Sequence, residues 1–363
     1  MGCASAGGHG SGLSIQGMSG MIEAVELATL NDGNQVRLVR VERTNGISDV
    51  AKWRAQYPAP TFDIVQDDGL FHAARCGQGH LGVVYAVTVR TQPKFNLNES
   101  RIFTTWDAVW PTVQQQLVDP NIHSLHVWIN PYLNDGKTSP TCVVTTLRRT
   151  TDAPRGKRGW GIEMGGMNPL TDLLRLFISI APGALPALLD SGLKTTVATD
   201  VVMPSPQALD FGAPNTLPVY AASLGFDAKD ADACLRALVG EINSWKAQNQ
   251  WVSSPMGMRW VKASEDYLSP QYARDTIMLE VPVLKGTPNA VQTLDRYATY
   301  MMQNWGGRPH WGQQNPMGRA LFEKNYGVGV KNFVSGFRTF NPRGFFDGAL
   351  TEQLGLRDIA NGR

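Results

Sequence analysis

One segment, which we call the decisive stretch, carries the strongest structural signal in the chain: Asp68-Gly69-Leu70-Phe71-His72-Ala73-Ala74-Arg75-Cys76-Gly77-Gln78-Gly79-His80-Leu81-Gly82-Val83-Val84. A helix that ends in closely spaced glycines and leads directly into β-branched residues brings the backbone of a strand close to a bound cofactor. The plainer alternative is a helix-to-strand turn capped by glycine, which leaves the spacing from Arg75 to Gly82 unexplained. The candidate cofactor-binding residues of this stretch are Gly77, Gly79, Gly82, Val83 and Val84.

A second glycine cluster lies at the front of the chain. Glycines permit positive φ angles and bring backbone N–H groups near a ligand, an arrangement that holds a pyrophosphate without cationic side chains. The alternative is a flexible N-terminal tail, because terminal residues are often poorly ordered. The candidate cofactor contacts in this cluster are Gly7, Gly8, His9, Gly10, Ser11 and Gly12.

Length and composition allow an enzyme and argue against several other classes. A chain of 363 residues, 42% of them hydrophobic, is long enough for two ordinary domains. The 33 Lys and Arg nearly balance the 31 Asp and Glu, and no basic run is interleaved with aromatics, so no nucleic-acid surface is predicted. The spacing of Cys3, Cys76, Cys142 and Cys234 predicts free thiols, and no metal site is predicted.

No targeting or membrane-spanning segment is predicted. Residues 1–20 lack a charged start followed by an apolar core, so a cytoplasmic location is the default expectation. The most apolar stretch, residues 173–189, contains Arg175, Pro182 and Pro186 and is too short for a spanning helix. We predict a pair of buried helical turns there, and the alternative is contact with a lipid surface or an apolar substrate.

The secondary-structure patterns predict an α+β protein with three zones. Residues 1–95 alternate glycine-rich turns with strand-like runs, and residues 96–300 predict an antiparallel sheet backed by helices. Residues 301–363 hold a Gly, Pro and Trp cluster, a helix and an irregular tail around 341–344. The elements expected are strands at 36–41, 82–89 and 276–284, a hairpin of 125–129 and 142–147 with a turn at 134–136, and helices at 235–245 and 290–302.

The two glycine motifs resemble the second half of the FAD-binding domain of the vanillyl-alcohol oxidase and p-cresol methylhydroxylase family, in which a G-x-HGSG turn precedes a GxLGVV strand. Arg308-Pro309-His310-Trp311-Gly312 resembles the RPHWGK signature of the alditol oxidase and D-arabinono-1,4-lactone oxidase branch of that family. The matched segments span the chain from end to end. Sterol oxidases of the same superfamily are a related alternative, which the apolar stretch at 173–189 would suit.

The resemblance implies a domain plan with FAD as cofactor. It makes 1–95 the second subdomain of a PCMH-type FAD-binding domain, 96–300 a cap or substrate-binding domain, and 301–363 a segment that returns to the flavin site. It places residues 8–12 along the flavin and its pyrophosphate, and 82–84 near the adenine or ribose end. The first FAD subdomain has no counterpart, which implies a fragment, a wrongly placed start codon, or a second chain that completes the FAD site. We therefore expect weak or no flavin retention by this chain alone.

The resemblance also implies catalytic residues. A Glu-x-Arg pair of the branch corresponds to Gly257-Met258-Arg259, so the arginine is kept and the glutamate is absent. The lysine that ends the RPHWGK signature is Gln313. Alcohol oxidation by a flavin needs a partner for the hydroxyl group and positive charge beside the reduced ring. The catalytic candidates are therefore Arg259, His310 and Gln313.

Both charged candidates have plainer alternatives. Arg259 could form a surface ion pair with Glu265 or Asp266, and His310 could be a histidine packed between its neighbours Pro309 and Trp311.

The function predicted from these residues is an FAD-dependent oxidoreductase. It would oxidise a CH–OH group of a small-molecule alcohol, sugar lactone or sterol by hydride transfer to flavin N5, with molecular oxygen as the electron acceptor. The alternatives are a dehydrogenase that uses another acceptor, and a non-catalytic remnant or subunit that has lost two active-site charges. The substrate, the covalent or non-covalent flavin linkage and the oligomeric state stay open at this point.

Overall fold

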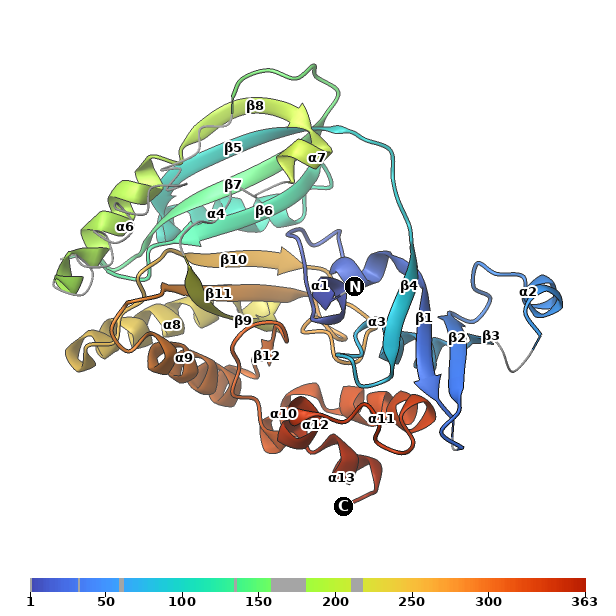
Figure 1. The fold of residues 1–363 in the computed structure, drawn as a ribbon. Helices are drawn as coiled ribbons and strands as arrows, with labels where there is room; N and C mark the ends of the chain where they lie inside the picture. Colours follow the sequence, from blue (N-terminus) through green and yellow to red (C-terminus); the bar gives the residue numbers. More distant parts are fainter. Residues whose placement is uncertain (1, 32, 59–61, 134–135, 158–180, 210–217) are drawn as a thin grey trace.

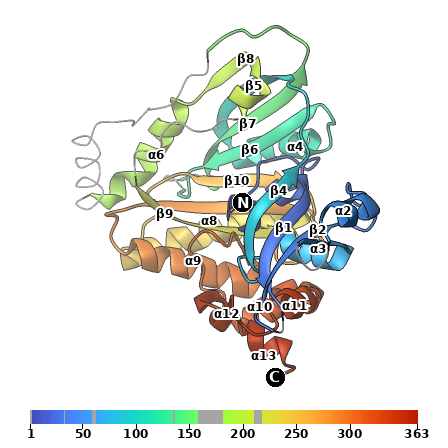
Figure 2. The ribbon, with the colours of Figure 1, turned by 45° about the vertical axis from the view of Figure 1, so that its right-hand side comes forward.

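Two β-sheets lie side by side in the computed structural model, with the N-terminus between them (Figures 1 and 2). Helices pack on both sheets, so the predicted α+β class is confirmed. The structure describes residues 2–31, 33–58, 62–133, 136–157, 181–209 and 218–363.

The smaller sheet has four strands in the order β3-β2-β1-β4 and is mixed, because β2 pairs parallel with β3 while β1 pairs antiparallel with β2 and β4. Strands β2 and β4 match the predicted strands, whereas β1 and β3 were not predicted. The decisive stretch folds as expected, with helix α3 leading through the glycine turn into β4. The elements are β1 (Ile22–Leu30), β2 (Val36–Glu42), α2 (Val50–Gln56), β3 (Phe62–Gln66), α3 (Asp68–Arg75) and β4 (Val83–Val89).

The larger sheet has eight strands, all antiparallel, in the order β12-β9-β11-β10-β6-β7-β5-β8. The predicted hairpin is formed by β6 and β7, although part of its expected turn, 134–135, lies outside the described residues. The strands are β5 (Asn96–Thr105), β6 (Ile122–Ile129), β7 (Thr141–Thr150), β8 (Ala198–Pro204), β9 (Val219–Asp227), β10 (Met256–Val261), β11 (Thr276–Leu284) and β12 (Arg308–Pro309).

Helices connect the strands and form the C-terminal part of the molecule. Of the apolar stretch at 173–189, residues 173–180 lie outside the described residues, and the rest forms η2 and the start of α6, where Leu185 and Leu189 are buried. Two short helices follow the irregular segment around 341–344. The helices are α1 (Gly2–Ser5), η1 (Met18–Met21), α4 (Trp106–Leu117), η2 (Pro182–Ala184), α6 (Leu185–Lys194), α7 (Ser205–Ala208), η3 (Ala228–Asp230), α8 (Ala231–Trp245), η4 (Lys246–Gln248), α9 (Ala290–Trp305), α10 (Arg319–Tyr326), α11 (Val328–Phe340), α12 (Ala349–Leu354) and α13 (Leu356–Ala360).

Side-chain alternation gives the larger sheet two different faces. Val127, Met258 and Leu279 are fully buried on one face, against which α4, α8 and α9 pack (Figure 1). Neighbouring residues along a strand point to opposite faces. The opposite face of the same strands therefore carries their polar side chains, and we call it the polar face.

The C-terminal residues contact both sheets. Strand β12 extends the larger sheet beside β9, whereas α11 crosses α3 on the smaller one. This crossing is close, since a Cβ atom added at Gly336 would lie 2.6 Å from the Cβ of Ala73.

A buried ion pair also joins the two sheets. Arg75, at the end of α3, donates from Nε to Oδ1 of Asp266 at 2.7 Å, and Asp266 lies on the loop between β10 and β11. Both side chains are fully buried. Burial alone would raise the pKa of Asp266, but hydrogen bonding from His72 and the charge of Arg75 hold that pKa below its usual value.

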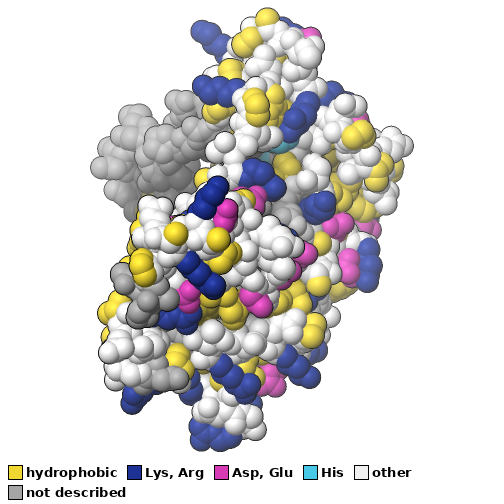
Figure 3. Space-filling view, turned by 90° about the vertical axis from the view of Figure 1, so that its right-hand side faces the viewer, with side chains coloured by type: hydrophobic (Ala, Val, Ile, Leu, Met, Phe, Trp, Pro, Cys, Tyr) yellow, Lys and Arg dark blue, Asp and Glu magenta, His cyan; other side chains and the backbone are white. Residues whose placement is uncertain are grey.

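No helix in the described part of the chain is both long and apolar enough to cross a bilayer. On the face shown in Figure 3, Lys and Arg side chains are interspersed with Asp and Glu. That face therefore lacks the large single-sign patch that a nucleic-acid surface would need.

Candidate functional site

The glycine segment, residues 7–12, leaves the N-terminal helix and lies against the larger sheet. Gly12 forms a bridge with Val261 at the end of β10, and Ser11 Oγ donates to the carbonyl of Leu125 on β6. Gly12 has φ 142°, and a Cβ atom there would lie 2.5 Å from the carbonyl oxygen of His123. Only glycine fits this close approach, so the segment is an ordered part of the fold and the flexible-tail alternative is wrong.

The middle of the glycine segment has free hydrogen-bond donors. The N–H groups at both ends are bonded, Gly8 to Cys3 and Gly12 to Trp260. No carbonyl of the described residues accepts from the backbone N–H of His9, Gly10 or Ser11. A Cβ atom added at Gly10 would meet nothing within 4 Å, so this stretch is open to a ligand. Successive unbonded N–H groups are a common way of binding phosphate.

The three sequence motifs meet around α1. The carbonyl of Ser5 accepts from Cys76 Sγ at 3.1 Å and from the amide of Gln78, both in the turn after α3. The carbonyl of Ala6 accepts from the backbone N–H of Trp311 at 3.0 Å. Segments around residues 5, 77 and 311 therefore lie together between the two sheets.

The cofactor-binding candidates of the decisive stretch lie in the turn after α3 and at the start of β4. Gly77 is buried at the end of α3, and Gly79 is exposed with φ 80°. Gly82 has φ 142°, and a Cβ atom there would lie 2.7 Å from a carbonyl oxygen of β1, so packing on β1 already explains this glycine. Val83 is 60% exposed and Val84 packs against the core.

Arg259 lies on β10, two residues after Gly257 and on the same face. None of the described residues forms an ion pair with Arg259. The alternative partners are engaged elsewhere, because Glu265 pairs with Arg43 and Asp266 with Arg75. The ion-pair alternative for Arg259 is therefore wrong, and its guanidinium charge is available to an anionic ligand.

Two histidines approach each other beside Arg259. The rings of His9 and His310 meet edge to face, with centroids 6.2 Å apart. Loss of solvation lowers the pKa of His9 well below its usual value, and the charges of Arg259 and His310 lower it further. Burial likewise lowers the pKa of His310, although the Glu280 carboxylate opposes that shift. Both rings are therefore neutral at pH 7.

The hydrogen bonds of His310 define its protonation. Its Nδ1 lies 3.2 Å from the backbone nitrogen of Gly312, which donates. A neutral imidazole that accepts at Nδ1 carries its proton on Nε2. His310 therefore offers a donor to a ligand oxygen, and its ring is partly exposed rather than packed between Pro309 and Trp311.

The rest of the Arg308–Gly312 motif is structural. Arg308 is buried, donates from Nε to the carbonyl of Asn325 at 2.7 Å and lies over the ring of Tyr326. Trp311 stacks on the same ring and donates to the carbonyl of Leu268 at 2.6 Å. These two residues hold the segment in place, and His310 faces the glycine segment between them.

Gln313 leads to a residue that sequence reasoning missed. Its Nε2 donates to Oε1 of Glu280 at 2.9 Å. Glu280 lies on β11 directly opposite Gly257, the position left without a side chain. The available signal was a single acidic residue inside the apolar run TIMLEVPVL, but only the pairing of β10 with β11 shows what it faces.

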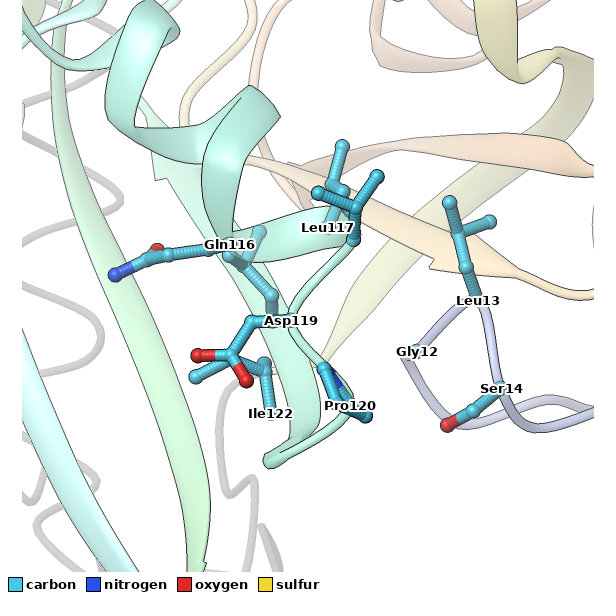
Figure 4. Close-up of a pocket in the computed structure, with 10 residues that line it drawn as sticks. Gly12, Leu13, Ser14, Gln116, Leu117, Asp119, Pro120 and Ile122 are labelled. Carbon is cyan, nitrogen blue, oxygen red and sulfur yellow. The ribbon is translucent and has the colours of Figure 1, made fainter.

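A separate hollow lies on the other side of the glycine segment (Figure 4). Gly12, Leu13 and Ser14 form one wall, and the turn from α4 to β6, with Asp119 and Pro120, forms the other. Its volume of about 200 Å³ is small beside ordinary ligand pockets, which begin near 300 Å³. Its lining includes neither Arg259 nor the two histidines, so the hollow is separate from the site that these residues form.

The described residues form neither a disulfide nor a cluster of metal ligands. All four cysteines are free thiols, and burial raises the pKa of Cys142 and of Cys234 to about 12, which keeps both protonated. Within the described ranges, no group of three or more His, Cys, Asp or Glu residues could hold a metal ion.

Comparisons with known proteins connect this geometry to a family. Residues 87–354 match the D-arabinono-1,4-lactone oxidase family. The L-gulono-1,4-lactone dehydrogenase of Mycobacterium tuberculosis is 23% identical over 268 residues, 70% of this chain and 56% of that protein. The L-gulonolactone oxidase of Bos taurus is 23% identical over 300 residues, 78% of this chain and 63% of that protein. The chain thus spans little more than half the length of the first of these relatives.

A solved structure shows the same fold. Cholesterol oxidase from B. sterolicum matches with a TM-score of 0.68 at 14% identity, over 97% of this chain and 74% of that one. The expected fold, part of a PCMH-type FAD-binding domain with an antiparallel cap sheet, is confirmed by this likeness. The family match covers well over half of the residues and includes Arg259, His310 and Gln313. The chain belongs to the D-arabinono-1,4-lactone oxidase family.

Proposed function

We propose that this chain is the substrate-facing part of an FAD-dependent oxidoreductase that oxidises a CH–OH group of a sugar lactone or a related alcohol. The observation that carries the proposal is the guanidinium of Arg259, which has no counter-ion among the described residues and lies within electrostatic reach of His9 in the glycine segment. A partly buried cation without a partner is costly unless a ligand supplies the anion.

The glycine segment fits the cofactor that the family implies. The unbonded N–H groups of His9, Gly10 and Ser11 are donors suited to a pyrophosphate, and the open space at Gly10 admits it. FAD, when bound, would supply the two-electron acceptor for oxidation of the alcohol.

The protein's own side chains would orient and polarise the substrate. Arg259 would place a permanent positive charge where negative charge develops during oxidation. His310 would donate from Nε2 to the substrate oxygen, because its Nδ1 is engaged by Gly312. Gln313 would act indirectly, by holding Glu280 through their 2.9 Å hydrogen bond.

The substrate class and the electron acceptor are inferred from different sources. Sequence relatives are named for gulonolactone, whereas the sterol oxidase shares only the fold, so we favour a lactone. The relatives include both a dehydrogenase and an oxidase, so the proposal covers oxygen and another electron acceptor.

A parallel assay of peroxide formation and dye reduction tests the proposal. The chain, supplied with FAD, is screened with aldonolactones, polyols and sterols, and we expect turnover with lactones. Arg259→Gln should lower turnover by about 10²- to 10³-fold, the usual cost of losing one charge-stabilising group. FAD binding without turnover on any substrate would favour the non-catalytic alternative, and unchanged turnover in Arg259→Gln would remove that residue from the site.

A further inference from the structure

A row of four residues crosses the polar face of the larger sheet. Trp128 on β6 pairs with Gly257 on β10, Gly257 pairs with Glu280 on β11, and Glu280 pairs with Ser223 on β9. Residues paired directly across antiparallel strands share a face. Arg259, two residues from Gly257, lies on this face as well.

The carboxylate of Glu280 has one oxygen engaged and one directed toward Gly257. Oε1 accepts from Gln313, whereas Oε2 lies 3.7 Å from the point where a Cβ atom at Gly257 would stand. The same point is 3.3 Å from the ring of Trp128. The missing side chain thus leaves a space bounded by an indole ring and a carboxylate oxygen.

The side chains of Arg259 and His310 near this space are donors. Arg259 has no acceptor atom in its side chain, and His310 presents the N–H of Nε2. An ionised carboxylate is acceptor-only, so Glu280 is the group suited to a ligand O–H.

Two further atoms of the same cluster lack partners. Ser223 Oγ and Gln313 Oε1 are buried and make no hydrogen bond in the described structure. Ser223 is only 3% exposed, and its carbonyl holds the backbone N–H of His310 at 2.8 Å. Unsatisfied buried polar atoms in a native fold call for a ligand or an ordered water.

We propose that Glu280 is the hydroxyl-binding residue of the site and that Glu280, Gln313 and Ser223 form a subsite for the hydroxyl groups of a neutral, polyhydroxylated ring. The proposal rests on the proposed function, because it takes the polar face to be the substrate side. The carboxylate accepts from ligand hydroxyls at Oε2, and Gln313 fixes its orientation at Oε1. The absence of a side chain at position 257 is what opens Oε2 to the ligand.

Calorimetric titration in the presence of saturating FAD, reduced beforehand and kept free of oxygen, tests this subsite without turnover. The probe is L-gulono-1,4-lactone, and γ-butyrolactone is the comparison ring that has no hydroxyl groups. Glu280→Gln removes the charge at nearly constant shape and should weaken L-gulono-1,4-lactone binding by about 10- to 100-fold, the range for hydrogen bonds to a charged group. Glu352→Gln, on the exposed surface of α12, is the matched control and should bind as the wild type does.

Two results would overturn the subsite. They are equal affinity of the wild-type chain for both rings, and unchanged affinity for L-gulono-1,4-lactone in Glu280→Gln. The proposed function fails separately: a chain that binds the lactone through Glu280 but gives no product would refute the oxidoreductase and keep the subsite. Turnover of the lactone with unchanged affinity in Glu280→Gln would do the reverse.

Discussion

Replacement of Asp266 by Asn should strongly destabilise the fold. The change leaves the guanidinium of Arg75 fully buried without its carboxylate. Removal of one member of a buried ion pair costs about 3–5 kcal/mol, because the remaining charge has no compensation. Total stabilities are commonly only about 5–15 kcal/mol, so a large share would be lost. The effect should exceed that of most single substitutions, since the pair connects α3 to the β10–β11 loop.

The adjacent residue provides the control. Glu265 is 58% exposed on its side chain and pairs with Arg43, whose side chain is 39% exposed. An exposed pair contributes about 1 kcal/mol or less, so Glu265→Gln should barely change stability. Urea unfolding followed by tryptophan fluorescence gives the free energy of unfolding of each variant. The two values are compared when both variants have the same m value, the slope of that free energy against urea concentration.

A double variant makes the reasoning more stringent. Arg75→Met combined with Asp266→Leu removes both charges, so it should cost less than either single change. If Asp266→Asn costs no more than Glu265→Gln, or if the double variant costs the sum of the singles, the buried charge is not the source of the effect.

Three further outcomes are expected. Gly82→Ala should lower the free energy of unfolding by about 1–3 kcal/mol, because φ is 142° and a β1 carbonyl oxygen would lie 2.7 Å from the new Cβ. Gly10→Ala, where the space is open, should leave that free energy unchanged in the same thermal or urea unfolding experiment. Burial lowers the pKa of His80 from 6.5 to about 4, so the unfolded chain takes up a proton before the folded protein does as the pH falls. The free energy of unfolding of the wild type should therefore fall by about 2 kcal/mol between pH 7 and 5 through this group. His80→Gln should lose that much less stability over the same range, and equal losses would refute the assignment. Gly336→Ala should destabilise by about 1–3 kcal/mol because its Cβ would lie 2.6 Å from an α3 side chain, while Gly240→Ala, an open helical position in α8, should slightly stabilise, and the reverse order would contradict the packing.

Local periodicity predicted β6, β7 and β11 of the larger sheet, whereas β5, β8, β9 and β12 were not predicted. The strand at 276–284 and the helix from residue 290 were read from alternation and helical spacing, and both appear as β11 and α9. Such patterns are visible because each face of an element has a uniform environment. The strands β1 and β3 were missed although their partner β2 was found.

The chemistry of the site was harder to predict than its location. Arg259 and His310 were named from short motifs, but the role of Glu280 depends on its register opposite Gly257. Register joins residues far apart in the sequence, and a shift of one residue would turn Glu280 to the other face. The donor role of His310 likewise depends on a backbone contact with Gly312, which composition and spacing do not reveal.

Residues 308–312 combine structural side chains with one that faces the ligand, and this difference should affect how related sequences diverge. Arg308 and Trp311 serve the scaffold through Asn325, Tyr326 and Leu268, so selection for folding alone is sufficient to keep them. His310 carries no comparable structural load. A lineage that abandons the ancestral reaction should therefore keep a recognisable signature while varying its central histidine, and sequence searches with this motif will recover relatives by architecture rather than by activity.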